Sequence, residues 1–127
     1  MNGVCPCGSG EGHPSCCGRF LDGGQFPETA EQLMRSRYSA YVLARADYLL
    51  TTWHPTTRPP AIALDAADQV QWLGLKVICA DNDSTTGVVE FVARHKLNGK
   101  AYRLHEVSQF VKQNGRWLYV TGKMKEA

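Results

Sequence analysis

The sequence predicts an α+β domain with helices packed on one face of a curved antiparallel sheet, preceded by a small zinc knuckle. Three observations support this. Four of the five cysteines lie between positions 5 and 17, the stretch from about 29 to 53 has a helical pattern, and the pattern changes to a period of two from Val70 onward. The chain has 127 residues, 43% of them hydrophobic and 20% charged, which is typical of one folded domain with a small appendage.

The cysteine cluster has three competing interpretations. A disulfide framework would suit a secreted domain, but the N-terminus lacks the apolar core of a secretory signal, and adjacent cysteines cannot bond to each other without strain. A redox site usually has the spacing Cys-x-x-Cys, which neither pair has. Zinc needs four thiolate or imidazole ligands, which two close pairs joined by a loop provide. We therefore expect one structural zinc ion per chain, held by Cys5, Cys7, Cys16 and Cys17.

Two other residues with ligand or redox chemistry are expected to have other roles. His13 lies inside the cluster, but four cysteines already complete a tetrahedral shell, so an exposed loop histidine is expected. Cys79 stands alone in the apolar run LGLKVICA and is expected to be a buried core thiol.

Charge and hydropathy narrow the class of protein. The net charge of +2 is too small to indicate a nucleic-acid-binding protein, although the segment after Arg94 is basic. No run of about 18 apolar residues is present, so no membrane span is predicted. Without a secretory signal, a cytoplasmic location is expected, where thiols stay reduced.

The helical region is predicted to begin at Thr29, whose side chain caps a helix with Gln32 three residues later. Asp47 is expected to cap a second short helix that starts near Tyr48. Three prolines then end the helical region, and residues 64–68 are expected to form one more helical turn. One face of the first helix is expected to carry Met34, Tyr38, Tyr41 and Val42.

Four strands joined by short turns are predicted after the helices. Asn98-Gly99 and Asn114-Gly115 are typical of two-residue hairpin turns. The expected strands are Val70–Ala80, Thr86–Lys96, Ala101–Lys112 and Arg116–Gly122.

The last hairpin predicts a register and hence a pocket wall. A two-residue turn at Asn114-Gly115 places Gln113 opposite Arg116 and Phe110 opposite Tyr119. Alternation of side chains then puts one set on a common face: Glu106, Ser108, Phe110, Trp117 and Tyr119. We expect a cavity between helix and sheet lined by Arg37, Tyr41, Trp53, His54, Glu106, Phe110, Trp117 and Tyr119, with Glu90 near it.

Several of these residues have a structural alternative. The aromatic residues could be core, and Glu106 could lie at a rim or in an ion pair. Glu90 could face Glu106 across the cavity or pair with Arg35 or Arg37. His54 could stabilise a helix end instead of acting as a general base.

The cysteine spacing resembles a known motif. Cys5-x-Cys7-x8-Cys16-Cys17, with Gly8-Ser9-Gly10 inside, is similar to the SEC-C motif of the C-terminal tail of the SecA translocation ATPase. That motif usually has Lys or Tyr before the final pair, where this chain has EGHPS. The resemblance implies a protein-docking module.

The rest of the chain resembles a family as well. The stretches LMRSRYSAY, DYLLTTWHPTTRP, WLGLKV, VEFVAR, HEVSQF and GRWLYVTG are similar to those of the YchJ-like family of uncharacterised bacterial proteins. The order of elements is similar to the cone-shaped nuclear transport factor 2-like (cystatin-like) fold. The resemblance implies a SEC-C-type zinc knuckle and linker in residues 1–24, a cone domain in residues 25–127, and a homodimer formed through the open sheet face.

Three functional hypotheses remain at this point. The first is a cytoplasmic adaptor whose zinc knuckle binds a protein or ribonucleoprotein partner and whose cone binds a small-molecule ligand. The second is an enzyme that performs acid–base chemistry in the cone pocket. The third is a nucleic-acid-binding protein that uses the basic C-terminal hairpins. No membrane partner is expected.

Overall fold

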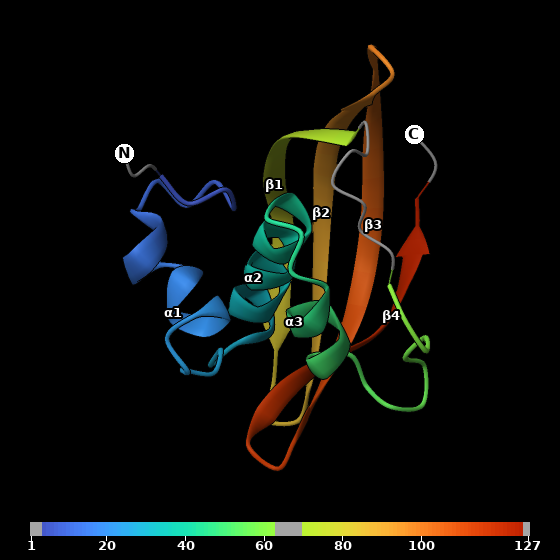
Figure 1. Cartoon of the computed structure of the whole chain (residues 1–127). Coiled ribbons are helices and arrows are strands. Elements are labelled where there is room, and N and C mark those ends of the chain that lie inside the picture. The colour runs from blue at the N-terminus through green and yellow to red at the C-terminus, as the bar shows by residue number, and fades with distance from the viewer. Residues whose placement is uncertain (1–3, 63–69, 126–127) are drawn as a thin grey trace.

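Helix α2 lies across one face of a four-stranded antiparallel sheet, and the N-terminal segment packs beside that helix (Figure 1). The computed structural model describes residues 4–62 and 70–125. The strands follow one another in the sheet as β1-β2-β3-β4. In chain order the elements are η1 (His13–Ser15), α1 (Gly18–Leu21), α2 (Ala30–Val42), α3 (Ala46–Thr51), β1 (Val70–Asn82), β2 (Thr86–Leu97), β3 (Lys100–Gln113) and β4 (Arg116–Met124).

The start of α2 matches the predicted cap. The Thr29 hydroxyl accepts a hydrogen bond from the backbone N–H of Gln32 at 3.1 Å. The Gln32 side chain in turn accepts from the N–H of Glu28 at 2.7 Å, one residue before the usual partner in a capping box. The predicted short second helix is present as α3, but the predicted cap was wrong, because α3 begins at Ala46 and Asp47 lies within its first turn.

Both predicted hairpin turns are confirmed. Asn98 and Gly99 have φ angles of 53° and 80°, and Asn114 and Gly115 have 52° and 78°. Two successive positive φ angles are typical of the type I′ turn, whose twist matches that of the flanking strands. The predicted register of the last hairpin is also confirmed, since Gln113 pairs with Arg116 and Phe110 with Tyr119.

A bulge in β1 overturns the prediction for Cys79. The register shifts between Val77 and Cys79, which places Cys79 opposite Glu90. After one extra residue in a strand, each following side chain points to the opposite face of the sheet from the one that simple alternation predicts. The thiol is therefore exposed rather than buried in the core.

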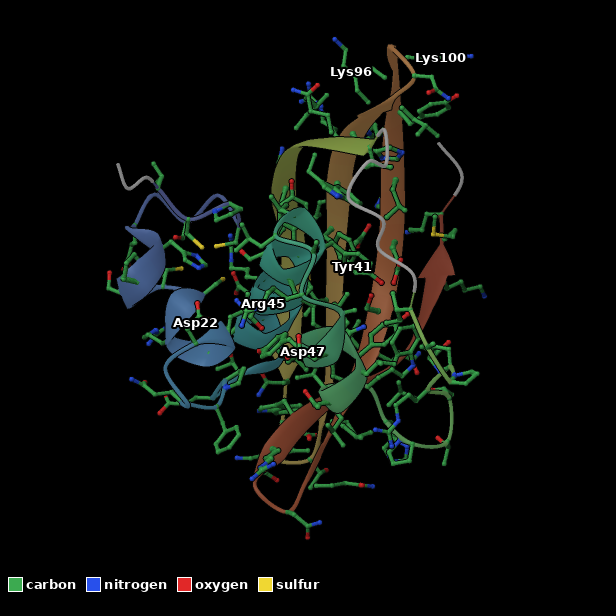
Figure 2. All side chains as sticks on the ribbon, viewed as in Figure 1. Asp22, Tyr41, Arg45, Asp47, Lys96 and Lys100 are labelled. Carbon is green, nitrogen blue, oxygen red and sulfur yellow. The ribbon has the colours of Figure 1, made fainter. Side chains whose placement is uncertain are left out.

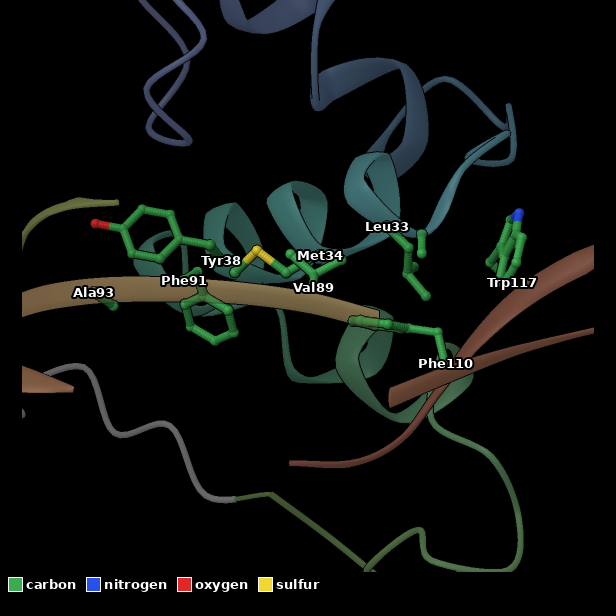
Figure 3. Close-up of a cluster of buried hydrophobic side chains, with 9 residues drawn as sticks. Leu33, Met34, Tyr38, Val89, Phe91, Ala93, Phe110 and Trp117 are labelled. Carbon is green, nitrogen blue, oxygen red and sulfur yellow. The ribbon is translucent and has the colours of Figure 1, made fainter. Parts of the chain in front are cut away.

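Two hydrophobic clusters hold the described structure together. The first lies between α2 and the sheet, where Leu33, Met34 and Tyr38 meet the β-strands (Figure 3). The second joins Cys5, Cys7 and Cys17 to α1, α2 and α3. Its members outside the cysteines are Phe20, Leu21, Ala40 and Leu49. The division into residues 1–24 and 25–127 stays a prediction, and this second cluster spans it.

Two further predictions concern the connecting segment and membranes. The helical turn expected at residues 64–68 lies outside the described residues. Among the helices that the structure describes, none has the length and apolar character needed to cross a membrane.

Candidate metal centre and cone pocket

The four clustered cysteines converge on one point. Their sulfur atoms all lie within 4.8 Å of one another, and three of the four residues are buried. The sulfur atoms of Cys7 and Cys16 are 3.7 Å apart. A tetrahedron with zinc–sulfur bonds of about 2.3 Å has edges of about 3.8 Å. Figure 2 shows sulfur atoms gathered beside the N-terminal segment. The arrangement therefore has the size of a four-thiolate metal site.

The backbone between the two pairs folds into a small loop that aims the thiols inward. The N–H of Cys5 donates to the carbonyl of Glu11 at 2.8 Å, and the N–H of Gly8 donates to the carbonyl of Cys5 at 3.2 Å. Gly8 has a φ of 83°, which the left-handed region allows glycine without strain. The hydroxyl of Ser9 lies 3.1 Å from the sulfur of Cys16. Local sequence thus forms most of the site.

The thiols of the cluster shift one another's pKa values. A hydrogen bond from the Cys17 thiol lowers the pKa of Cys7 to about 4. The same hydrogen bond raises the pKa of Cys17, and burial raises that of Cys16. Neighbouring thiols therefore stabilise one thiolate, whereas four thiolates at this distance would repel one another. A bound metal ion would offset this repulsion, and a soft four-sulfur donor set fits zinc.

Side chains from outside the loop surround the cluster. Ser39 of α2 is fully buried, and its hydroxyl lies 3.6 Å from the sulfur of Cys5. Arg35, one turn earlier, donates to the carbonyl of Cys7 at 2.9 Å. Nδ1 of His13 lies 3.5 Å from the sulfur of Cys5, so this histidine contacts a cysteine rather than standing free in solvent. Helix α2 therefore supports the candidate metal centre directly.

A cavity of about 280 Å³ lies on the opposite side of α2, between the helix and the sheet. It includes six of the predicted pocket residues: Arg37, Tyr41, Trp53, Glu106, Phe110 and Tyr119. Its other lining residues are Met34, Tyr38, Trp72, Phe91, Ala93, Leu104 and Ser108. The lining is mostly apolar with a few polar groups, which is the usual composition of a small-molecule site.

Arg37 is the buried cation of this cavity. Only 6% of its surface is exposed, and burial lowers its pKa. Nη1 donates to the carbonyl of Leu49 and to the hydroxyl of Thr52, both at 2.8 Å. The guanidinium carbon lies 5.0 Å from the ring centre of Trp53 and 4.5 Å from that of Tyr119. These contacts fix the guanidinium between two aromatic rings.

Glu106 is the carboxylate of the cavity. It accepts a hydrogen bond from the Ser108 hydroxyl at 2.6 Å. A Cβ atom at Gly122 would overlap this carboxylate and would lie 3.0 Å from the Tyr119 hydroxyl. Burial, followed by the charge of Glu106, raises the pKa of Tyr119 to about 12. Glycine at position 122 thus leaves room for a cluster of oxygen atoms at one end of the cavity.

Two predicted pocket residues lie elsewhere. Trp117 is 2% exposed and belongs to the core, where its indole N–H donates to the carbonyl of Glu28 at 3.2 Å. Its ring lines a separate pocket together with Phe20, Phe26 and Tyr48. The imidazole of His54 hydrogen-bonds Thr56 at 2.8 Å, while its backbone N–H donates to Tyr119. That backbone bond turns the chain along β4 and leaves the His54 ring outside the cavity.

Glu90 lies on the other face of the sheet, contrary to the prediction that it is near the cavity. Phe91 pairs with Glu106 across β2 and β3, so Glu90 points away from both. Its carboxylate contacts Nε2 of His105 at 2.8 Å and Nζ of Lys125 at 3.7 Å. The contact with His105 lowers the pKa of Glu90. The ion pair with Arg35 or Arg37 is therefore also excluded.

Two residues that shape the cavity were not predicted from the sequence. Trp72 lines the cavity and packs edge-on against Tyr38, with ring centres 5.6 Å apart. A bulge between Trp72 and Gly74 puts Trp72 on the same strand face as Leu75, which simple alternation from Val70 does not predict. Gly122 has no sequence signal, since its role depends on the rotamer of Glu106.

Comparisons with known proteins agree with this geometry. A family model described as the YchJ middle NTF2-like domain matches residues 29–122. The chain belongs to the YchJ-like family. It is 55% identical over 124 residues to a UPF0225 protein of Chromobacterium violaceum, covering 94% of this chain and 91% of that protein. A UPF0225 protein of Bordetella pertussis is 52% identical over 124 residues, with 95% and 92% covered.

Two solved structures of SEC-C motif containing proteins have the same fold as this family member. The solution structure from Rhodopseudomonas palustris matches with a TM-score of 0.86 at 36% identity, covering 99% of this chain and 100% of the other. The crystal structure from Psychrobacter arcticus matches with a TM-score of 0.78 at 27% identity, covering 98% and 84%. The predicted family, SEC-C motif and NTF2-like fold are confirmed.

Proposed function

We propose that this YchJ-like protein is a cytoplasmic zinc-dependent docking protein whose cone domain binds a small ligand. The observation that carries the proposal is the set of four sulfur atoms within 4.8 Å of one another, three of them on buried residues. Four cysteines fill a tetrahedral shell and leave no position for a substrate, which is the mark of a structural site. Zinc would be held by Cys5, Cys7, Cys16 and Cys17.

The loop between the cysteine pairs supports the docking role. Residues 8–12 are all exposed, whereas the metal-ligating side chains around them point inward. A metal ion would therefore fix the shape of an outward-facing loop that carries Ser9 and Glu11. A loop of fixed shape loses little conformational entropy on binding a partner, which favours affinity. The proposed partner is a protein or ribonucleoprotein.

Affinity capture from native cytosol tests the docking role with four baits. The intact chain and Glu28→Lys, a charge reversal at an exposed site outside the loop, should capture the same partner. Glu11→Lys, which changes only the loop surface, and the double substitution of Cys16 and Cys17 by serine should both lose it. Capture of the same proteins by all four baits would refute the docking role.

The cavity supports the ligand-binding part of the proposal. Its apolar lining suits a ligand that is mainly aromatic or aliphatic, and Glu106 could accept a hydrogen bond from a hydroxyl or amino group at one end. Trp53 and Trp72 line the cavity, so a bound ligand should change the tryptophan fluorescence. Glu106→Gln should remove that response to a ligand found with the intact chain while leaving the fold unchanged.

An enzyme is the second candidate, and one observation favours it. Glu106, Ser108 and Tyr119 bring a carboxylate and two hydroxyls together at the end of an apolar cavity. Glu106 would be the general base, because a tyrosine with a pKa of about 12 stays protonated near neutral pH. Turnover of a bound compound that Glu106→Gln abolishes, with binding retained, would establish this role.

A further inference from the structure

The hairpin formed by the ends of β2 and β3, residues 93–104, extends beyond the helices and forms an arm (Figure 1). We call it the hairpin arm. The sequence from Phe91 to His105 contains no acidic residue. Figure 2 shows Lys96 and Lys100 at the tip of the arm. The arm carries four cations: Arg94, Lys96, Lys100 and Arg103.

No ion pair involves these cations among residues 4–62 and 70–125. Arg94 and Arg103 are direct cross-strand partners in the antiparallel ladder. Like charges placed opposite each other destabilise a sheet. The arm therefore has a concentrated positive charge that only a group outside these residues can neutralise.

Aromatic rings line the face of the arm that continues from the cavity. The rings of His95 and Tyr102 are stacked, with centres 5.5 Å apart and planes 18° apart. The ring of His95 also packs against that of Trp72, a cavity-lining residue, with ring centres 5.4 Å apart. Nζ of Lys100 lies 5.7 Å from the ring centre of Tyr102. Tyr102 is 43% exposed, so the line of rings ends at a surface that a planar group can reach.

We propose that the hairpin arm binds single-stranded nucleic acid. Alternation along the paired strands puts Arg94, Lys96 and Arg103 on the face opposite Tyr102 and Lys100, so the bound strand would pass around the edge of β3, which β4 pairs only from Glu106 onward. Its phosphates would contact the cations of both faces, and an unpaired base would stack on Tyr102. Backbone cations combined with stacking rings are the arrangement that single strands require, because each unpaired base has an accessible aromatic face. A double helix keeps its base faces covered, and an anionic membrane needs the cations but not the exposed tyrosine. This site is separate from the zinc knuckle and from the ligand proposed for the cavity.

Fluorescence anisotropy with a short labelled oligouridine tests the proposal through its salt dependence. Each phosphate neutralised on a single strand contributes about −0.7 to the slope of log affinity against log salt concentration, so four cations predict a slope of roughly −3. Replacing Lys96 and Lys100 together by alanine should reduce the magnitude of the slope by about 1.4. Lys112→Ala, an exposed lysine at the far end of β3, is the matched control and should leave the slope unchanged.

The tyrosine separates base stacking from charge. Tyr102→Ala should weaken oligouridine binding roughly 5- to 150-fold, the range expected for one stacked base, without changing the salt slope. Tyr102→Phe should bind as the intact chain does, and thermal unfolding of each variant verifies that the fold is retained. Equal binding by Tyr102→Ala and the intact chain, or equal affinity for inorganic polyphosphate, a duplex or anionic vesicles, would overturn the proposal.

Discussion

Removing the metal is expected to loosen helix α3 as well as the cysteine segment. Leu49 of α3 and Ala40 of α2 are completely buried in the cluster that contains Cys5, Cys7 and Cys17. When the cysteine segment loses its metal, it loses most of the energy that holds it folded, since metal binding in small sites is itself folding energy. The apolar surface that it covers on the two helices is then exposed to water.

The size of the effect follows from the side chains that are uncovered. Exposing a buried leucine costs about 1.5–3 kcal/mol, and exposing the Ala40 methyl costs about 0.8 kcal/mol. The total of about 2–4 kcal/mol is smaller than the 5–15 kcal/mol that stabilises a typical domain. The cluster between α2 and the sheet contains none of the cysteines. The cone should therefore remain folded, with a melting temperature lowered by about 10–15 °C.

Amide hydrogen exchange with and without a zinc chelator measures this directly. Residues 4–22 should lose protection, amides of α3 should exchange about 30- to 900-fold faster, and β2 and β3 should change little. Cys17→Ser should reproduce the effect of the chelator. Cys79→Ser removes an exposed thiol outside the cluster and is the control. Unchanged protection in α3 would refute the claim that the cysteine segment stabilises this helix. Loss of protection throughout the sheet would refute the claim that the cone stays folded without the metal.

Two further predictions concern the sheet. Gly122→Ala should destabilise the protein by about 1–3 kcal/mol in urea unfolding, because its Cβ displaces the Glu106 carboxylate, whereas Gly74→Ala meets no atom within 4 Å and should not. An equal effect of the two substitutions would contradict this account of the cavity. His105 holds the pKa of Glu90 below its usual 4.5, so the intact chain should be more stable than Glu90→Gln above that pH and should lose the advantage as pH falls through the lowered pKa. A stability difference that persists in acid would exclude the carboxylate as its source.

Local chemistry made the cysteine cluster and the hairpins predictable. Four sulfurs within thirteen residues meet because two short turns suffice, and no distant contact is needed. The two Asn-Gly turns set the strand register because their backbone conformation allows only one pairing. The same argument applied to Asn98-Gly99 pairs Leu97 with Lys100 and hence Glu90 with Val107. This would have shown from the sequence that Glu90 faces away from Glu106.

The sequence-based predictions of side-chain position were wrong where a bulge or the packing of a helix decides which residues are buried. Cys79 is exposed because β1 has a bulge between Val77 and Cys79, and no residue type in that stretch indicates a bulge. Trp117 shares a strand face with Tyr119, but it is buried in the cluster that contains Ala30 and Leu33 of α2, which strand alternation cannot reveal. The position of the Arg37 guanidinium between the rings of Trp53 and Tyr119 likewise depends on how α2 lies across the sheet.

X-ray absorption at the zinc edge tests the central claim most directly. Protein purified without added metal and without chelator should contain one zinc ion per chain, with four sulfur ligands at about 2.3 Å. The matched Cys17→Ser variant should lose the metal, while Cys79→Ser should give the same spectrum as the intact chain. A metal-free protein with oxidised thiols, or a zinc shell in which the nitrogen of His13 replaces a sulfur, would contradict the four-cysteine centre.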